Sequence, residues 1–385
     1  MDILPPPKRE PKLPVAPQPP AEKVTPVNDP VPAQLTLNRK PPFFRQKKFW
    51  IFAAIGVVIA AIISTAVWYN WALQPVNKND QQNVRLIVTS GETSREIIDN
   101  LAAQGLVRSK LATRIYIDLS GKKDKLQAGG YLLAKNMKVS DIVEHIASGK
   151  TDELNITILP GLTLKELADS QVDGSLAQQG FSKEEIEAAF TASYNSPLLA
   201  DRPQGQTLEG YIFPETYRMN AGDKLNTVFE RAFDELYQKL KNDGLIEKFA
   251  ARGLNLHQAL TLASIVGREV ANPTEQKQVA QVFYSRLAQN MVLGADATFE
   301  YAAEQLGVTP AVDIDSPYNT RTNPGLPPGP IANMNYTALQ AVADPAPGDY
   351  LYFVSGDDGK TYFARTFEEH EANIAAHCHD LCNLY

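Results

Sequence analysis

An uncharged run of 23 residues, from Phe49 to Trp71, is the feature that most constrains how this chain of 385 residues can fold. As a helix it is about 35 Å long, and the hydrocarbon core of a bilayer is about 30 Å thick. Amphipathic rings, which favour the membrane interface, lie near its two ends: Trp50, Trp68, Tyr69 and Trp71. We therefore predict a transmembrane helix over residues 49–72. A cleaved signal peptide is the weaker interpretation, because its apolar core is shorter and precedes a small-residue cleavage site.

The basic residues next to this run lie almost all on its N-terminal side. Lys78 alone lies close after it, whereas five precede it: Arg39, Lys40, Arg45, Lys47 and Lys48. Because segments rich in Lys and Arg stay in the cytoplasm, we predict a cytoplasmic N-terminus. Everything after about residue 73 is then expected on the outer face of the cytoplasmic membrane, which makes the chain a single-pass membrane protein.

Residues 1–48 differ in composition from the rest of the chain. They are rich in Pro, Lys and Gln, contain about half of the 27 prolines, and show no apolar periodicity. Such a segment cannot bury enough apolar surface to fold, so we predict a disordered cytoplasmic tail. A plain tether and a Pro-rich ligand for a partner domain are both compatible with this composition.

The charge balance restricts what the exported part can bind. Residues 1–48 carry nine Lys/Arg and four Asp/Glu in a chain of net charge −7, so the part after residue 48 has a net charge of about −12. An acidic domain does not attract anionic polymers by bulk electrostatics, and we expect no nucleic-acid partner. Recognition of a glycan or peptide by shape and local hydrogen bonds fits better. Two cysteines, both among the last eight residues, exclude a disulfide scaffold.

The first exported segment, residues 82–152, predicts a small module with the order β-α-α-β-α. A β-like run, VRLIVT, is followed by a capping-box sequence that begins at Thr93. A second helix is expected near 110–119 and a strand at 131–133, and Ser140 begins a third helix. This order resembles a LysM-like glycan-binding module. A generic α+β spacer is the alternative, because no aromatic platform is evident.

Residues 153–370 predict a larger α+β domain. Capping-box sequences begin helices at Thr163 and Ser182, and a β-hairpin is expected over 351–363. The fold class expected for the chain is therefore α+β, with one N-terminal membrane helix, a small module and a larger domain. Residues 371–385 are expected to form a C-terminal tail.

The segment LEGYIFPETY, residues 208–217, is aromatic, acidic and interrupted by Gly and Pro. One interpretation is a buried turn whose rings fill the core. The other is the wall of a sugar-binding cleft, since aromatic faces pack against the C–H faces of pyranose rings. In the second interpretation Tyr211 and Glu215 contact the substrate.

A helix expected over 257–270 places one carboxylate on an apolar face. Leu262, Ile265, Val266 and Glu269 follow one another at the spacing i, i+3, i+4 and i+7. Burial disfavours the charged form of a carboxyl group and raises its pKa, which is the condition for a general acid near neutral pH. The alternative is a Glu near a helix end that turns to solvent or pairs with an Arg.

Three later motifs are suited to shaping a cleft: DAT at 296–298, YNTR at 318–321 and GLPPGPI at 325–331. The last is too rich in Pro and Gly for a helix or a central strand, and it predicts a rigid loop. Loops that expose amides and hydroxyls commonly carry binding sites.

Six motifs follow one another in order: LEGYIFPETY, ASIVGREV, DAT, YNTR, GLPPGPI and YLYFV. With them the chain resembles the YceG-like family of endolytic murein transglycosylases from about residue 82 to 370, and its membrane run has that family's arrangement. The resemblance implies a lyase that cuts the β-1,4 bond between N-acetylmuramic acid and N-acetylglucosamine of peptidoglycan and leaves a 1,6-anhydro end. It also implies no cofactor, no catalytic metal, and cell-wall synthases as partners.

The resemblance implies that Glu269 is the catalytic residue, because it matches the second Glu of the family's A-S-I-[IV]-E-[KR]-E stretch. The first Glu of that stretch is replaced by Gly267. Ala297 and Arg321 also depart from the usual Pro and Tyr, which affects the shape of the cleft.

The expected chemistry needs one carboxyl group. Our hypothesis is that Glu269 protonates the glycosidic oxygen and that its carboxylate then accepts the proton of the muramic C6 hydroxyl, as that oxygen attacks the anomeric carbon. The side chains expected to bind substrate come from the motifs above: Tyr211, Glu215, Asp296, Thr298, Tyr318, Asn319 and Thr320.

Two other functions stay open. A muramidase that uses water needs two carboxylates about 5 to 9 Å apart, and Asp296, Glu215 and Glu209 are the candidates for the second. A non-catalytic glycan-binding scaffold of the cell-wall synthesis complex is favoured by Gly267.

The C-terminal sequence HCHDLC, residues 377–382, places ligand-type side chains at close spacing. We expect a solvated tail here, with a metal site or a local disulfide as the alternatives.

Overall fold

The computed structural model describes residues 47–380 and 382, so the tail predicted for residues 1–48 lies almost entirely outside the described residues. The chain divides into two units, residues 1–64 and 65–385, and each is described by itself. Helix α1 (Lys47–Ala72) has 26 residues. From Lys48 to Ala72 it is long and apolar enough to cross a membrane, and none of its apolar window is buried by protein. An apolar helix without a protein partner is what a membrane span requires.

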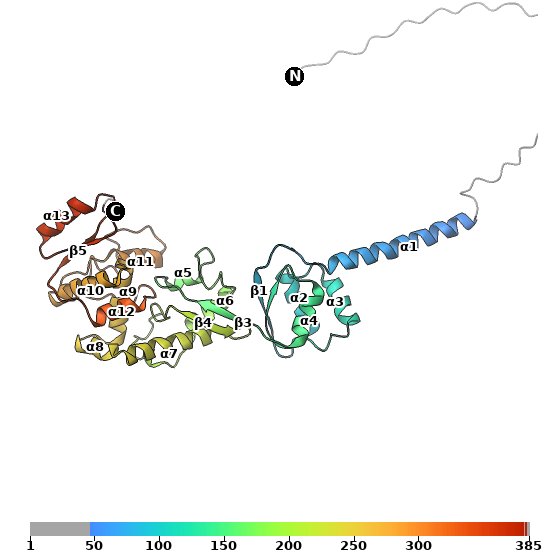
Figure 1. Ribbon diagram of the computed structural model, residues 1–385, viewed down its shortest axis with the longest axis horizontal. Coiled ribbons are helices and arrows are strands. Elements are labelled where there is room, and N and C mark those ends of the chain that lie inside the picture. Colours follow the sequence, from blue (N-terminus) through green and yellow to red (C-terminus); the bar gives the residue numbers. More distant parts are fainter. Residues whose placement is uncertain (1–46, 381, 383–385) are drawn as a thin grey trace, which may run out of the picture. The chain divides into compact units, whose positions relative to one another are not determined.

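The small module (residues 82–152) has its elements in the predicted order (Figure 1). Its two strands form an antiparallel pair in which Leu86 lies opposite Tyr131. Both side chains are buried and pack against apolar residues of the three helices. The elements are β1 (Asn83–Val88), α2 (Ser94–Ala103), α3 (Lys110–Leu119), β2 (Gly129–Ala134) and α4 (Val139–Ser148). The likeness of this module to LysM stays a prediction.

The larger domain (residues 153–370) is mixed α+β, with strands in two antiparallel pairs, β3 with β4 and β5 with β6. Helices make up most of the rest (Figure 1). The elements up to α9 are β3 (Glu153–Thr157), α5 (Leu164–Ala168), α6 (Lys183–Thr191), the 3-10 turn η2 (Pro197–Leu199), β4 (Thr216–Asn220), α7 (Asn226–Asn242), α8 (Leu245–Ala251) and α9 (Leu256–Glu269). Those that follow are α10 (Pro273–Ala288), α11 (Asp296–Leu306), α12 (Tyr336–Ala343), β5 (Tyr352–Ser355), β6 (Thr361–Ala364) and α13 (Phe367–His377).

Local signals begin several of these helices as the sequence predicts. Thr93, Thr163 and Ser182 each accept a hydrogen bond from the backbone of the Glu three residues later, whose side chain accepts one from the cap residue's own amide. Each capping box satisfies amides that the first helical turn leaves unpaired. Asn272 caps α10 differently, by accepting hydrogen bonds from the amides of Thr274 and Glu275, before a proline at the first helical position.

Helix α9 lies at the centre of the larger domain. Ten of its 14 residues are buried, and it contacts α8, α10, α11 and α12. A helix that is apolar on almost every face is stable only when other elements surround it. The packing of α9 against these helices therefore sets the position of its last residue, Glu269.

Strand β4 is absent from the sequence prediction. The residues after the LEGYIFPE turn form β4, which pairs antiparallel with β3 so that Ile156 lies opposite Tyr217. Burial alternates along β4, with Tyr217 and Met219 inside. Five residues are too few for this alternation to stand out in the sequence, and the strand depends on pairing with a distant segment.

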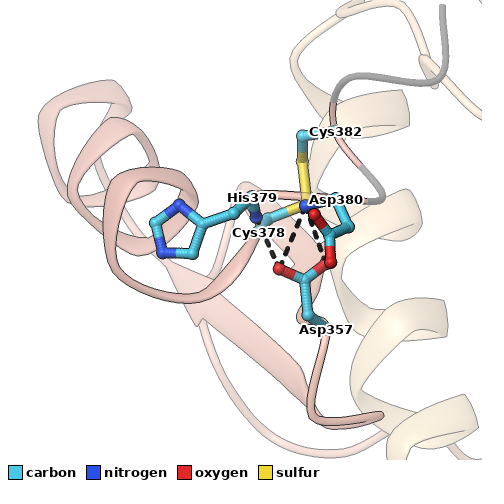
Figure 2. The surroundings of a disulfide bond; sticks show 5 residues. All are labelled: Asp357, Cys378, His379, Asp380 and Cys382. Carbon is cyan, nitrogen blue, oxygen red and sulfur yellow. Dashed lines mark hydrogen bonds between the residues drawn. A yellow bond between two sulfur atoms is a disulfide. The ribbon is translucent and has the colours of Figure 1, made fainter.

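The C-terminal tail is more ordered than predicted. Helix α13 extends to His377, and Cys378 forms a disulfide with Cys382. Figure 2 shows the Asp357 carboxylate, in the turn between β5 and β6, accepting hydrogen bonds from the backbone amides of His379 and Asp380. His379, Asp380 and Cys382 are exposed, as expected for a solvated tail, but Asp357 fastens the segment to the hairpin and the bridge closes it into a small loop. Of the alternatives left open for HCHDLC, the local disulfide is the one found.

Candidate active site

Glu269 is the last residue of α9, and its carboxyl group is largely removed from water. Its Oε1 atom is buried and has no hydrogen-bond partner among the described residues. The residue as a whole is half-buried, so part of it stays within reach of a ligand. The alternative in which this side chain turns to solvent is wrong, because the helix that carries it ends inside the packed domain.

The surroundings of Glu269 favour its protonated form. Burial raises its pKa to about 7, and the negative charges of Asp296 and Glu300 add to this rise. A hydrogen bond from the backbone amide of Ala297 and the positive charge of Arg321 act in the opposite direction. A carboxyl group with this pKa exchanges its proton near neutral pH, which is what a residue acting as acid and then as base requires.

Arg321 bonds directly to Asp296. Its Nε and Nη2 atoms lie 2.6 Å and 2.5 Å from the same carboxylate oxygen, Oδ1. The guanidinium carbon also lies 5.9 Å from the centre of the Phe299 ring. Both members of the pair are partly exposed, so the pair contributes little to stability. Its importance is that it places one negative and one positive charge beside Glu269.

Three of the residues predicted to bind substrate lie inside the protein and bond to it. The hydroxyl oxygens of Thr298 and Thr320 lie within hydrogen-bond distance, 2.9 Å apart. Thr298 also donates to the carbonyl of Ala295, and Thr320 accepts from the amide of Ala295. The Asn319 side-chain amide donates to the carbonyls of Val312 and Ile314. Because these groups are buried and already partnered, the prediction of direct substrate contact does not fit them. They join the start of α11 to the YNTR loop and so position Asp296 and Arg321.

Tyr211 is also buried, which favours the first of the two interpretations of LEGYIFPETY. Its hydroxyl oxygen lies 2.7 Å from Nδ1 of His257, whose Nε2 lies 2.8 Å from the carbonyl oxygen of Pro328. A carbonyl can only accept, so Nε2 carries a proton. This chain of bonds joins the LEGYIFPETY turn to the GLPPGPI loop through α9, and no face of the Tyr211 ring is open to a sugar.

The remaining predicted residues lie at different places on the surface. Tyr318 is half-buried, with its ring centre 5.0 Å from that of Tyr301 and its hydroxyl 3.5 Å from Gln206. Glu215 is exposed and lies 3.9 Å from the ammonium of Lys239 on α7. Of the side chains predicted to bind substrate, Asp296 alone has a described interaction with Glu269.

A second buried carboxyl group, Glu209, lies in the LEGYIFPETY turn. Both of its oxygens accept from the backbone amide of Leu164, at the start of α5. Burial raises its pKa to about 8, and the charges of Glu304 and Glu166 contribute. From the sequence Glu209 was only a candidate second carboxylate, because its burial depends on α5, which is distant in the sequence.

Helix α11 carries an acidic face that relates the two buried groups. Asp296, Glu300 and Glu304 are spaced four residues apart and share one side of the helix. The charges of Asp296 and Glu300 raise the pKa of Glu269, and the charge of Glu304 raises the pKa of Glu209. A row of carboxylates accepts hydrogen bonds from hydroxyl groups and repels anions, so this face suits a neutral, hydroxyl-rich ligand better than a phosphate.

A pocket of about 750 Å³ opens between α5, α6 and the loop before Glu209. Its lining includes Lys165, Phe190, Tyr194, Arg202 and Gln206. Glu269 is not among its residues. Since Gln206 also contacts Tyr318, the pocket adjoins the Glu209 side of the site rather than the Glu269 side.

Gly267 lies two residues before the end of α9, close to α12. A Cβ atom placed there meets the Cβ atoms of Ala338 and Met334 at 3.5 Å and 3.7 Å, which are ordinary contacts. A small side chain therefore fits at this position, and the glycine is not required by close packing.

Comparison with known proteins identifies the family of the chain. The model of the YceG-like family matches residues 86–376. The chain belongs to the YceG-like family. The match covers the small module and the larger domain together, including Glu269.

Among curated relatives of this YceG-like chain, an endolytic murein transglycosylase of Bacillus subtilis is 30% identical over 330 residues, covering 80% of this chain and 89% of the relative. A protein of the same name from Streptococcus pneumoniae is 30% identical over 368 residues, and the match spans 86% of this chain but only 66% of that protein's length. A crystal structure of a putative YceG-like protein from Listeria monocytogenes has 26% identity and a TM-score of 0.49, covering 76% of this chain and 99% of that one.

Proposed function

We propose that this chain is an endolytic murein transglycosylase. It cleaves the β-1,4 bond between N-acetylmuramic acid and N-acetylglucosamine in peptidoglycan and leaves a 1,6-anhydro end. The observation that carries this proposal is the buried carboxyl group of Glu269, held beside Asp296 and Glu300 in a chain of the YceG-like family. Relatives named endolytic murein transglycosylase support the same reaction.

One carboxyl group serves both halves of this reaction. Protonated Glu269 gives its proton to the glycosidic oxygen as the bond from that oxygen to the anomeric carbon breaks. The C6 hydroxyl oxygen of the same muramic residue then bonds to the anomeric carbon, and its proton passes to the Glu269 carboxylate. The enzyme returns to its starting state, and no water is consumed.

Two of the other carboxyl groups near the site are poorly placed to activate water. The Asp296 carboxylate forms an ion pair with Arg321. The Glu209 carboxyl group accepts hydrogen bonds from the backbone amide of Leu164. It also holds its proton at neutral pH, because burial raises its pKa to about 8. A water-using muramidase needs a second ionised carboxylate free to act as base or nucleophile. The intramolecular hydroxyl attack therefore fits this site better.

We further infer that α1 anchors the protein in the cytoplasmic membrane with its N-terminus inside and the larger domain outside. The basic residues before α1 support this orientation. The bond between Cys378 and Cys382 supports it independently, because disulfides persist in oxidising compartments and are rare in the cytosol. In this location the enzyme acts on nascent glycan strands beside the cell-wall synthases and ends their elongation.

The test is product analysis by mass spectrometry of uncrosslinked glycan strands incubated with the wild type and with Glu269→Gln. The wild type is expected to release fragments whose ends lack one water. The variant is expected to release them about 10² to 10⁴ times more slowly. Glu247→Gln, which alters an exposed carboxylate on α8, is the matched control and is expected to keep its activity.

Three results would contradict the proposal in different ways. Hydrated fragment ends would indicate a muramidase. No soluble fragment from the wild type would indicate a glycan-binding scaffold. Full activity of a folded Glu269→Gln variant would remove Glu269 from the chemistry.

A further inference from the structure

The C-terminal end of α1 is bound to the small module rather than followed by a free linker. Ala72 is fully buried, and the carbonyl of Leu73 accepts a hydrogen bond from the amide of Val139. The guanidinium of Arg108 donates to the carbonyls of the next three residues, at 3.3 Å to Gln74, 2.6 Å to Pro75 and 3.0 Å to Val76. These bonds hold residues 72–76 against the small module.

The same contacts place α3 next to the end of α1. The Arg108 guanidinium carbon lies 4.9 Å from the centre of the Trp71 ring, and α3 begins two residues later. Tyr116, on α3, is a neighbour of Tyr69 of α1. Tryptophan and tyrosine at the end of a membrane span lie at the level of the lipid headgroups. If α1 spans the bilayer, α3 lies near that level too.

Helix α3 has apolar residues on both sides. Its inner side is buried through Ala112, Thr113 and Ile117. On the outer side Leu111, Ile115 and Leu119 are spaced four residues apart and form one stripe. Leu111 is 59% exposed and Leu119 is 78% exposed. We name these three residues the α3 stripe.

Basic residues surround the α3 stripe. Residues 108–125 contain six Lys/Arg and two Asp/Glu, although the part of the chain after residue 48 is strongly acidic. Lys110 and Lys122 pair with Asp99 and Glu144, whereas Arg114, Lys123 and Lys125 form no ion pair within residues 47–380. An apolar stripe flanked by unpaired cations is the pattern of a helix that lies in the membrane interface.

We propose that α3 lies on the outer surface of the same membrane, with the α3 stripe among the lipid headgroups and its basic flanks on anionic phospholipid. Two observations favour lipid over a protein partner: Arg108 and Tyr116 lie beside the aromatic end of the membrane span, and the basic flanks of the stripe are complementary to anionic headgroups. The inference rests on the membrane anchor of the proposed function. A span and a surface helix together fix the orientation of the small module at the membrane, which a single span does not do.

The experiment places a fluorescent probe on α3 in the full-length chain. Both native cysteines are in the disulfide, so a single introduced cysteine is the one reactive thiol. Leu119→Cys and Leu111→Cys are labelled with an environment-sensitive dye and reconstituted into vesicles of phosphatidylcholine with phosphatidylglycerol. Leu306→Cys, an exposed leucine at the end of α11, is the matched control. Alkaline carbonate extraction of the same vesicles tests the anchor separately.

On α3 we expect blue-shifted emission, strong quenching by spin-labelled lipid and weak quenching by aqueous iodide, with the opposite result at Leu306. Omission of phosphatidylglycerol, or Arg114→Glu with Lys123→Glu, is expected to reduce the lipid quenching. If the chain resists extraction while the α3 probes behave like the control, the anchor stands and the α3 inference is overturned. If the chain is extracted, both are wrong. Shielding from iodide without any lipid quenching also overturns the inference, since it indicates a protein partner.

Discussion

Arg321 and Asp296 form an ion pair in which two guanidinium nitrogens, Nε and Nη2, lie 2.6 Å and 2.5 Å from one carboxylate oxygen. The two residues act on Glu269 with opposite signs, because Asp296 raises its pKa and Arg321 lowers it. The proton affinity of the proposed catalytic acid therefore depends on a pair of surface charges contributed by two different segments.

Changing this pair is expected to move the alkaline limb of the pH profile. Arg321→Gln removes the cation and leaves the charge of Asp296 unopposed, so the pKa of Glu269 rises and the limb moves to higher pH. Asp296→Asn has the opposite effect, because it removes the anion and leaves the cation. The measurement is kcat/KM for anhydro-product formation across pH 5 to 9 (about the range of a Glu with this pKa). Two profiles that both coincide with the wild type would exclude this role.

The buried carboxyl groups are expected to make the protein less stable as pH rises. Burial raises the pKa of Glu269 to about 7 and that of Glu209 to about 8, from an ordinary 4.5. The folded state therefore binds these protons more tightly than the unfolded state. The contribution is fully present below about pH 4.5 and is lost as pH rises through each folded-state pKa.

Glu269→Gln cannot titrate, so it is expected to lose part of this pH dependence. Between pH 4.5 and 8 the free energy of unfolding of the wild type should fall by up to about 3 kcal/mol more than that of the variant. Urea denaturation of the full chain in detergent at several pH values measures the difference. Parallel pH dependences in the two proteins would show that Glu269 is not desolvated in the folded state.

Gly267→Ala is expected to stabilise the protein by about 0.5 to 1 kcal/mol. Position 267 is helical, and a Cβ there makes only ordinary contacts with Ala338 and Met334, so the gain in helix propensity is not offset by a clash. Thermal or urea unfolding measures this change. A destabilised variant would mean that α9 and α12 cannot accept a methyl group between them.

Removing the disulfide is expected to affect the C-terminal tail and not the reaction. The bridge joins residues only four apart, so Cys378→Ser with Cys382→Ser should cost at most about 2 kcal/mol and act near α13. The segment should become more sensitive to limited proteolysis, while formation of anhydro product stays unchanged. Asp357→Asn, which weakens the acceptor for the amides of His379 and Asp380, should give a milder form of the same effect.

Features that depend on neighbouring residues were predictable from the sequence. The apolar run from Phe49, the capping boxes at Thr93, Thr163 and Ser182, and the placement of Glu269 on an apolar helix all follow from side-chain chemistry over a few turns. The order of elements in the small module follows from the same signals. Such features survive in the fold because local hydrogen bonds and periodicity already favour them.

The tertiary structure decided which polar residues are buried and which are accessible to a ligand. Tyr211, Thr298, Asn319 and Thr320 lie in motifs that suit substrate binding, yet the fold buries them and uses their hydrogen bonds internally. A buried polar group must be partnered within the protein, and whether a residue is buried depends on segments distant in the sequence.

Composition and periodicity were enough to establish a membrane-type helix, an α+β chain and one acidic residue on an apolar face. They did not establish that α11 brings Asp296 and Glu300 to Glu269, that Glu209 is enclosed against α5, or that the end of α1 is bound by Arg108. The reason is physical. A helix or cap is stabilised by residues within one or two turns, whereas the proton affinity of a carboxyl group is set by the charges and the loss of water that distant segments impose when they pack around it.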